Sequence, residues 1–114
     1  MQSIAMAFPV LPGKSKQARE LAKAVKAKHA KDFALSEKKS KVTKEFWFLQ
    51  TSSQGDMIID YLEAANPAKG FATFAKSKDK FDVWLKAQIK DISGIDMNKP
   101  SDDPLPEVLL SFPF

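Results

Sequence analysis

Large apolar side chains alternate with small ones from Ile4 to Val10, so that one face of an extended segment is apolar. This period of two predicts a β-strand. Because proline cannot donate a backbone hydrogen bond, Pro9 favours an edge position or the end of the strand. The Leu11-Pro12-Gly13 segment then breaks the pattern.

The pattern next changes to helical spacing. Ser15 is a suitable N-cap residue for the helix. The apolar stripe that follows consists of Ala18, Leu21, Ala22, Val25, His29 and Phe33. This spacing predicts a helix that starts at Ser15 and continues, with or without a break, through Lys41.

An aromatic-rich segment over Glu45–Leu49 predicts a second strand, and Met57–Glu63 predicts a third. The polar segment between them has turn chemistry, and such a short connection predicts an antiparallel hairpin. If Gln50 lies opposite Met57, the next pairs are Trp47 with Asp60 and Phe46 with Tyr61. A β-bulge would shift this register.

The C-terminal half predicts two more helices and a strand. Asn66-Pro67 opens a short helix that carries two phenylalanines. Ser77 or Asp79 caps a longer helix, and Gly94 is well placed as its C′ residue. We expect a loop over residues 98–106 and a final strand over Pro106–Phe112.

The order of elements is therefore strand, helix, strand, strand, helix, strand. This order is typical of the α+β, ferredoxin-like βαββαβ fold, with a four-stranded antiparallel sheet and the helices on one face. The chain has 114 residues and no linker that would divide it, which predicts a single domain over residues 1–114.

Both faces of the predicted sheet are apolar. Phe46 and Phe48 point to one face, while Trp47 and Leu49 point to the other. An apolar face exposed to water usually marks an interface. We expect a second copy of the chain to cover it, giving a homodimer through the sheet face. The alternative is that the C-terminal segment folds back over the sheet.

Composition excludes several classes of site. There is no cysteine, which removes disulfides, thiolate metal sites and cysteine nucleophiles. The net charge is +4, but Arg19 is the only arginine among 18 basic residues, so we expect no specific nucleic-acid binding. No signal peptide and no apolar run long enough for a membrane span is apparent, and we expect a cytoplasmic protein without a membrane partner.

Two segments carry a resemblance to known proteins. They are Trp47–Thr51 with Gln54–Met57 running into Tyr61–Glu63, and Phe81-Asp82 with Trp84 and Gly94–Asp96. The chain resembles a bacterial family of small proteins of unknown function, which is similar to the dimeric α/β-barrel superfamily that includes antibiotic-biosynthesis-type monooxygenases. The resemblance implies a ferredoxin-like protomer whose sheets pair into a barrel. It implies no activity, since no catalytic motif of a characterised branch matches.

His29 and Asp60 are the candidate catalytic residues. His29 is the only histidine and lies on the apolar stripe, where it is either a general base facing a pocket or a histidine at the edge of the core. Asp60 is a carboxylate in an otherwise apolar strand, and burial in a cavity would raise its pKa. Its alternative is an edge position or a lysine partner. With one histidine and no carboxylate cluster apparent, we expect no metal and no cofactor.

Trp47, Tyr61 and Trp84 are the candidate ligand-pocket residues, although aromatic residues at such positions usually serve packing. The leading hypothesis is a homodimer that binds a small apolar molecule between helices and sheet. One alternative is a cofactor-independent, monooxygenase-like enzyme with His29 or Asp60 as base. The other is an association module without ligand chemistry.

Overall fold

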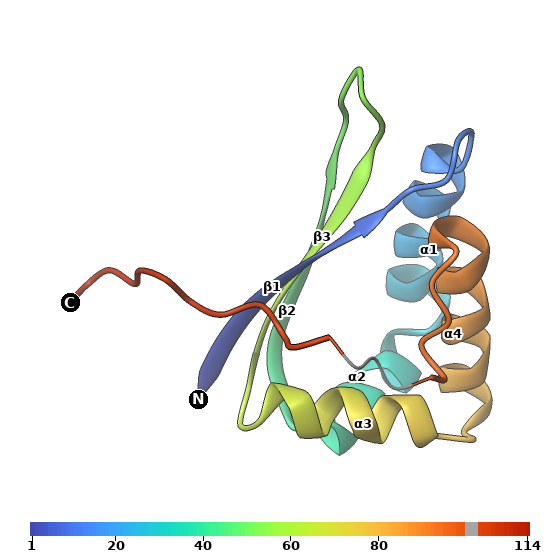
Figure 1. The fold of residues 1–114 in the computed structure, drawn as a ribbon. Coiled ribbons are helices and arrows are strands. Elements are labelled where there is room, and N and C mark those ends of the chain that lie inside the picture. Colours follow the sequence, from blue (N-terminus) through green and yellow to red (C-terminus); the bar gives the residue numbers. More distant parts are fainter. Residues whose placement is uncertain (100–102) are drawn as a thin grey trace.

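We describe a computed structural model of the chain for residues 1–99 and 103–114. It contains three strands and four helices in this part of the chain, shown in Figure 1. Their order is β1 (Gln2–Pro9), α1 (Ser15–Lys28), α2 (Ala30–Lys39), β2 (Val42–Gln50), β3 (Met57–Ala64), α3 (Pro67–Lys76) and α4 (Lys80–Ser93).

The strands form one antiparallel sheet in the order β1-β3-β2. The predicted hairpin register is confirmed, because Gln50 pairs with Met57 and Trp47 pairs with Asp60. A bulge does occur, but it lies at the start of β2, between Val42 and Lys44, and leaves these pairs in place. Trp47 and Asp60 therefore lie side by side on the same face of the sheet.

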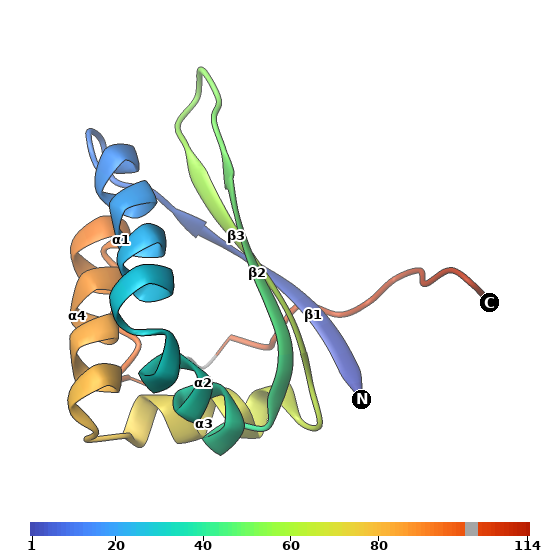
Figure 2. The same ribbon diagram turned by 180° about the vertical axis from the view of Figure 1, so that it is seen from behind.

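All four helices lie on one side of the sheet, as the two opposite views in Figures 1 and 2 show. The predicted first helix is divided at His29, whose backbone (φ −128°, ψ 22°) is not helical. Gly94 ends α4 in the left-handed conformation (φ 80°), as its position predicted. At the start of α3, the Asn66 side chain accepts a hydrogen bond from the Lys69 amide.

The core lies between the sheet and the helices. Its larger part is formed by Leu21 and Val25 of α1 against Leu85 and Ile92 of α4. A smaller part gathers around Leu62 of β3, near the end of the sheet where α3 packs. The alternation read from the sequence separated the two faces of β2 correctly, because Trp47 and Leu49 pack against the core whereas Phe46 and Phe48 are exposed.

The predicted four-stranded ferredoxin-like sheet, and the dimeric barrel built on it, is wrong. The described residues contain three strands, and Pro106–Phe112 pairs with none of them. Leu105 still packs near Leu62, but the chain then runs to the side of the sheet opposite the helices (Figures 1 and 2). The apolar run at residues 108–110 has strand propensity, but a strand also needs a partner strand, which is distant in the sequence. In addition, the prolines on either side of this run cannot donate backbone hydrogen bonds to such a partner. The predicted loop over 98–106 includes residues 100–102, which lie outside the described residues.

Candidate functional site

A cavity of about 100 Å³ lies between the sheet and the helices. Every helix and strand contributes to its wall. Most of the wall is aliphatic or aromatic, as the helix-facing side of the sheet and the apolar stripes of the helices dictate. The cavity-lining residues are Phe8, Ala18, Leu21, Phe33, Ser36, Glu37, Ser40, Val42, Glu45, Trp47, Ile58, Asp60, Leu62, Pro67, Gly70, Phe71, Phe74, Leu85, Ile89, Ile92, Ser93 and Met97.

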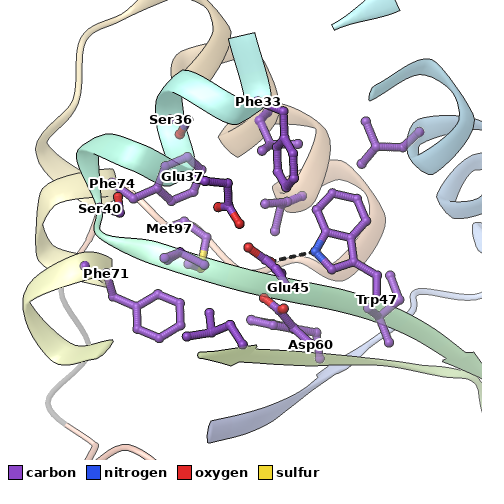
Figure 3. A pocket seen from close by; sticks show the side chains of 18 of the residues that line it. Phe33, Ser36, Glu37, Ser40, Glu45, Trp47, Asp60, Phe71, Phe74 and Met97 are labelled. Atoms are coloured by element: carbon purple, nitrogen blue, oxygen red, sulfur yellow. Dashed lines mark hydrogen bonds between the residues drawn. The ribbon is translucent and has the colours of Figure 1, made fainter. Parts of the chain in front are cut away.

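Three carboxyl groups enter this apolar space from three different elements. Glu37 comes from α2, Glu45 from β2 and Asp60 from β3, and Figure 3 shows them pointing toward one another. Glu45 lies at the centre of the group, since it hydrogen bonds with both Glu37 and Asp60. We call these three residues the carboxyl cluster.

The surroundings of the cluster favour the protonated acids. Burial, followed by the hydrogen bond and the repulsion from Glu45, raises the pKa of Glu37 to about 10. The same causes in the same order raise the pKa of Asp60 to about 9. No lysine, arginine or histidine is among the cavity-lining residues to offset the charge. At neutral pH both groups are therefore proton donors within an apolar space.

Asp60 has an unsatisfied oxygen. Its Oδ1 atom is buried and lacks a hydrogen-bond partner, and it is the single side-chain atom of this kind in the described part of the chain. Native proteins leave few buried polar atoms unpaired, and those that remain call for an explanation. Asp60 lines the cavity, so a group bound there could approach its carboxyl.

Trp47 links the aromatic wall to the carboxyl cluster. Its indole Nε1–H donates a hydrogen bond of 2.7 Å to Oε2 of Glu45, drawn as a dashed line in Figure 3. The edge of the Phe33 ring packs on Trp47, with ring centroids 6.0 Å apart. Phe71 and Phe74 of α3 line the same cavity. The arrangement combines apolar surface with a small number of convergent polar groups, which is typical of ligand pockets.

The structure places two of the five predicted site residues, Trp47 and Asp60, in the cavity wall. It places two others, His29 and Trp84, side by side outside the cavity. His29 lies outside the cavity, at the junction of α1 and α2, where its ring packs on Trp84 with centroids 4.5 Å apart. His29 Nδ1 is 3.9 Å from a carboxylate oxygen of Asp32. Tyr61 lies on the opposite face of the sheet, where its hydroxyl donates to Glu63.

Two residues of the carboxyl cluster were missed in the sequence. Glu37 continues the four-residue spacing of Val25, His29 and Phe33, so that the stripe itself places it on the core side of α2. Glu45 lies two residues before Trp47 and therefore on the same face of β2. Both signals were present, but each requires a glutamate to be accepted at a core position.

A second buried polar group lies next to the cavity, between α2, α3 and α4. Asp82 is only 1% exposed and accepts hydrogen bonds from Ser36 (2.6 Å), Ser77 (2.5 Å) and Lys39 (2.8 Å). Burial acts to raise the pKa of Asp82, but these hydrogen bonds outweigh it and hold the pKa below its ordinary value. Lys86, also 1% exposed, donates to the carbonyls of Ala75 and Ser77. We call this group the Asp82 network.

The geometry limits the possible sites. Among residues 1–99 and 103–114, no three His, Asp or Glu side chains are arranged so that they could hold a metal ion. None of the helices in the same residues has the length and hydrophobicity that crossing a bilayer requires.

Comparison with known proteins leaves the chain without relatives: it matches no family model, no curated protein and no solved structure. The resemblance to the dimeric α/β-barrel superfamily therefore stays a prediction. Any function must be argued from the site itself.

Proposed function

We propose that this protein binds a small, largely apolar molecule in the cavity between the helices and the sheet. The observation that carries the proposal is the combination of an apolar cavity of about 100 Å³ with the carboxyl cluster and the Trp47 indole in its wall. A cavity that serves only packing gains nothing from buried carboxyls, because burying a polar group without full pairing costs free energy. Binding of a ligand would offset that cost.

A cavity-filling variant tests the proposal. Ala18 of α1 lines the cavity, so that Ala18→Met should occupy part of it. Ala22, an exposed residue on the same helix, provides the matched control Ala22→Met. Native mass spectrometry of freshly purified protein should show an added small mass on the wild type and on Ala22→Met, and little or none on Ala18→Met.

Two results would overturn the binding proposal. The first is a wild-type protein that carries no added mass and whose Trp47 indole N–H resonance also fails to respond to small probes. Equal occupancy of Ala18→Met and Ala22→Met would also contradict it, provided that both variants unfold at a temperature close to that of the wild type.

Proton transfer to the bound molecule is a second candidate function. The raised pKa values of Asp60 and Glu37 favour it, because groups that hold a proton at neutral pH in a closed site can act as general acids. Asp60→Asn preserves the shape of the side chain and removes the transferable proton. If the protein is an enzyme of this kind, the variant should copurify with unreacted substrate, whereas the wild type releases or carries product. The same bound mass on both proteins would favour binding alone.

We also propose that the protein forms a homodimer through the outer face of the sheet. Phe46 and Phe48 are 52% and 51% exposed there, and Phe46 packs against the Phe48 and Tyr61 rings. On β1, at the other edge of the sheet, the same face carries small side chains such as Ala5 and Ala7. A second copy related by a twofold axis would cover the aromatic side chains of both.

Charge substitutions on that face test the dimer. Phe48→Lys should convert a dimer into a monomer in light scattering at micromolar concentration, because a lysine would be buried opposite its own copy. Val83→Lys, at an exposed apolar position on α4, is the control and should leave the dimer intact. A wild-type monomer at this concentration would contradict the proposal.

A further inference from the structure

The charge balance of the cavity indicates what kind of molecule it could hold. Each charged or titratable residue in its wall is acidic: Glu37 from α2, Glu45 from β2 and Asp60 from β3. The strand β1 and the helices α1, α3 and α4 contribute only apolar residues, a glycine and Ser93. The three carboxyls therefore face one another with no cationic side chain between them.

The polar neighbours do not satisfy this group. The Ser36 hydroxyl donates to Asp82, outside the cavity, and the Ser93 hydroxyl donates to the Ile89 carbonyl. The Trp47 indole reaches only Glu45. Oδ1 of Asp60 is buried and has no hydrogen-bond partner among residues 1–99 and 103–114. A ligand that fits the cavity should therefore bring hydrogen-bond donors, and preferably positive charge, to the carboxyls.

The shape of the wall favours an organic cation over a metal ion. Among residues 1–99 and 103–114, no group of three acidic or histidine side chains could hold a metal ion. Rings from Phe33, Trp47, Phe71 and Phe74 surround the same space, and aromatic faces attract ammonium groups as well as alkyl groups. An alkylammonium ion meets both requirements, since its head donates up to three hydrogen bonds and its body is apolar.

The volume sets the size of the molecule. A cavity of about 150 Å³ can hold benzene, and the present cavity, at about 100 Å³, is smaller. On that scale the ligand has roughly four to five non-hydrogen atoms. We propose, building on the binding function proposed above, that the cavity selects small alkylamines, with the ammonium group among Glu37, Glu45 and Asp60.

Binding of this kind should release a proton. Glu37 and Asp60 hold protons while the cavity is empty, and a bound ammonium ion takes the place of a proton beside the carboxylate. If one proton leaves for each amine bound, the affinity increases by up to about tenfold for each unit by which the pH rises, as long as the pH lies below the raised pKa values of Glu37 and Asp60. The charged and titratable groups that face the ligand are the three members of the cluster, as the composition of the wall shows.

The two tryptophans provide a reporter and an internal control for the experiment. Trp47 lines the cavity, whereas Trp84 lies outside it beside His29. We would titrate the ¹⁵N-labelled full chain at pH 8 with isobutylamine, and separately with isobutanol, a neutral molecule of the same size. The Trp47 indole N–H should shift with isobutylamine at a Kd at least tenfold lower than with isobutanol, while the Trp84 indole stays in place.

Charge-removing variants complete the test. Asp60→Asn or Glu37→Gln should weaken isobutylamine binding at least tenfold and leave isobutanol binding unchanged. If one of the two variants does not fold, the other provides the test. Glu20→Gln, on the exposed side of α1, should have no effect. Equal binding of both probes would overturn the choice of an amine and leave the binding function standing. A Trp47 indole that responds to neither probe would contradict both.

Discussion

The carboxyl cluster and the Asp82 network are two buried polar groups that share one helix. Ser36 donates to Asp82 on one side of α2, and the next residue, Glu37, enters the cavity. Asp82 has a cationic partner, Lys39, and two hydroxyl donors. The carboxyl cluster has no cation in its wall and leaves one oxygen of Asp60 unpaired.

This difference separates a structural role from a binding role. A buried polar network whose members are all paired stabilises the packing of the elements that it joins, here α2, α3 and α4. A partly paired polar group in a cavity lowers the stability of the fold. A protein that keeps such a group therefore calls for another explanation, which we propose is ligand binding. The same kind of side chain, a buried aspartate, therefore serves the fold at Asp82 and the site at Asp60.

The largest effect should follow from breaking the Asp82 network. Asp82→Asn removes the negative charge that faces Lys39 and replaces an acceptor of three hydrogen bonds by an amide that accepts fewer. Asp82 is buried whereas Lys39 is exposed. Leaving a buried donor without its partner costs about 1–3 kcal/mol, and more where a charged group is involved. We expect a decrease of that order in the free energy of unfolding, measured by urea denaturation at pH 7.

Asp91 provides the matched control. It forms an exposed ion pair with Lys14, at 3.4 Å. Exposed pairs contribute about 0–1 kcal/mol, so that Asp91→Asn should change stability little. If Asp82→Asn cost no more than Asp91→Asn, the Asp82 network would not be the stabilising element described here.

The same chemical change should have the opposite sign in the cavity. The pKa of Asp60 is raised by burial to about 9, so the folded state keeps a proton that the unfolded chain releases above its ordinary pKa. The free energy of unfolding therefore falls as the pH rises from about 4 toward about 9. Asp60→Asn removes this penalty, and we expect it to stabilise the protein by roughly 1–3 kcal/mol at pH 7.

The pH dependence distinguishes this cause from a general effect of the substitution. The difference between Asp60→Asn and the wild type should grow between pH 5 and pH 8 in urea denaturation. Glu20→Gln, on an exposed surface, should show no such growth. A constant or negative difference would mean that Asp60 is ionised in the folded protein.

Those parts of the fold that depend on local patterns could be predicted from the sequence. The alternation in Glu45–Leu49 and Met57–Glu63 predicted the hairpin, its register and which side chains share a face. The prediction of a strand over Pro106–Phe112 was wrong. A strand exists only if another strand shares its backbone hydrogen bonds, and a local sequence pattern does not show whether such a partner is present.

The candidate site could be predicted in part for a related reason. Trp47 and Asp60 were found together because strand pairing fixes cross-strand neighbours. Glu37 and Glu45 were missed because each requires a glutamate to be accepted at a core position. Tyr61 and Trp84, which looked equivalent to Trp47 by residue type, lie on other surfaces of the molecule. Residue type alone does not tell which side of an element meets a cavity.

The smallest effect should come from Trp47, whose indole N–H donates a hydrogen bond to the carboxyl cluster. Trp47→Phe removes the hydrogen bond to Glu45 and keeps an aromatic ring in the wall. A typical intramolecular hydrogen bond contributes about 1 kcal/mol, and we expect a loss of that order in unfolding free energy at pH 7. Trp84→Phe, which changes a ring packed on His29, corrects for the loss of ring area. A double-mutant cycle with Glu45→Gln should return a coupling of similar size. No coupling would mean that Trp47 acts on the cavity through packing alone. Apart from the protons that the carboxyls themselves hold, the hydrogen-bond donors for the carboxyl cluster would then have to come from the ligand.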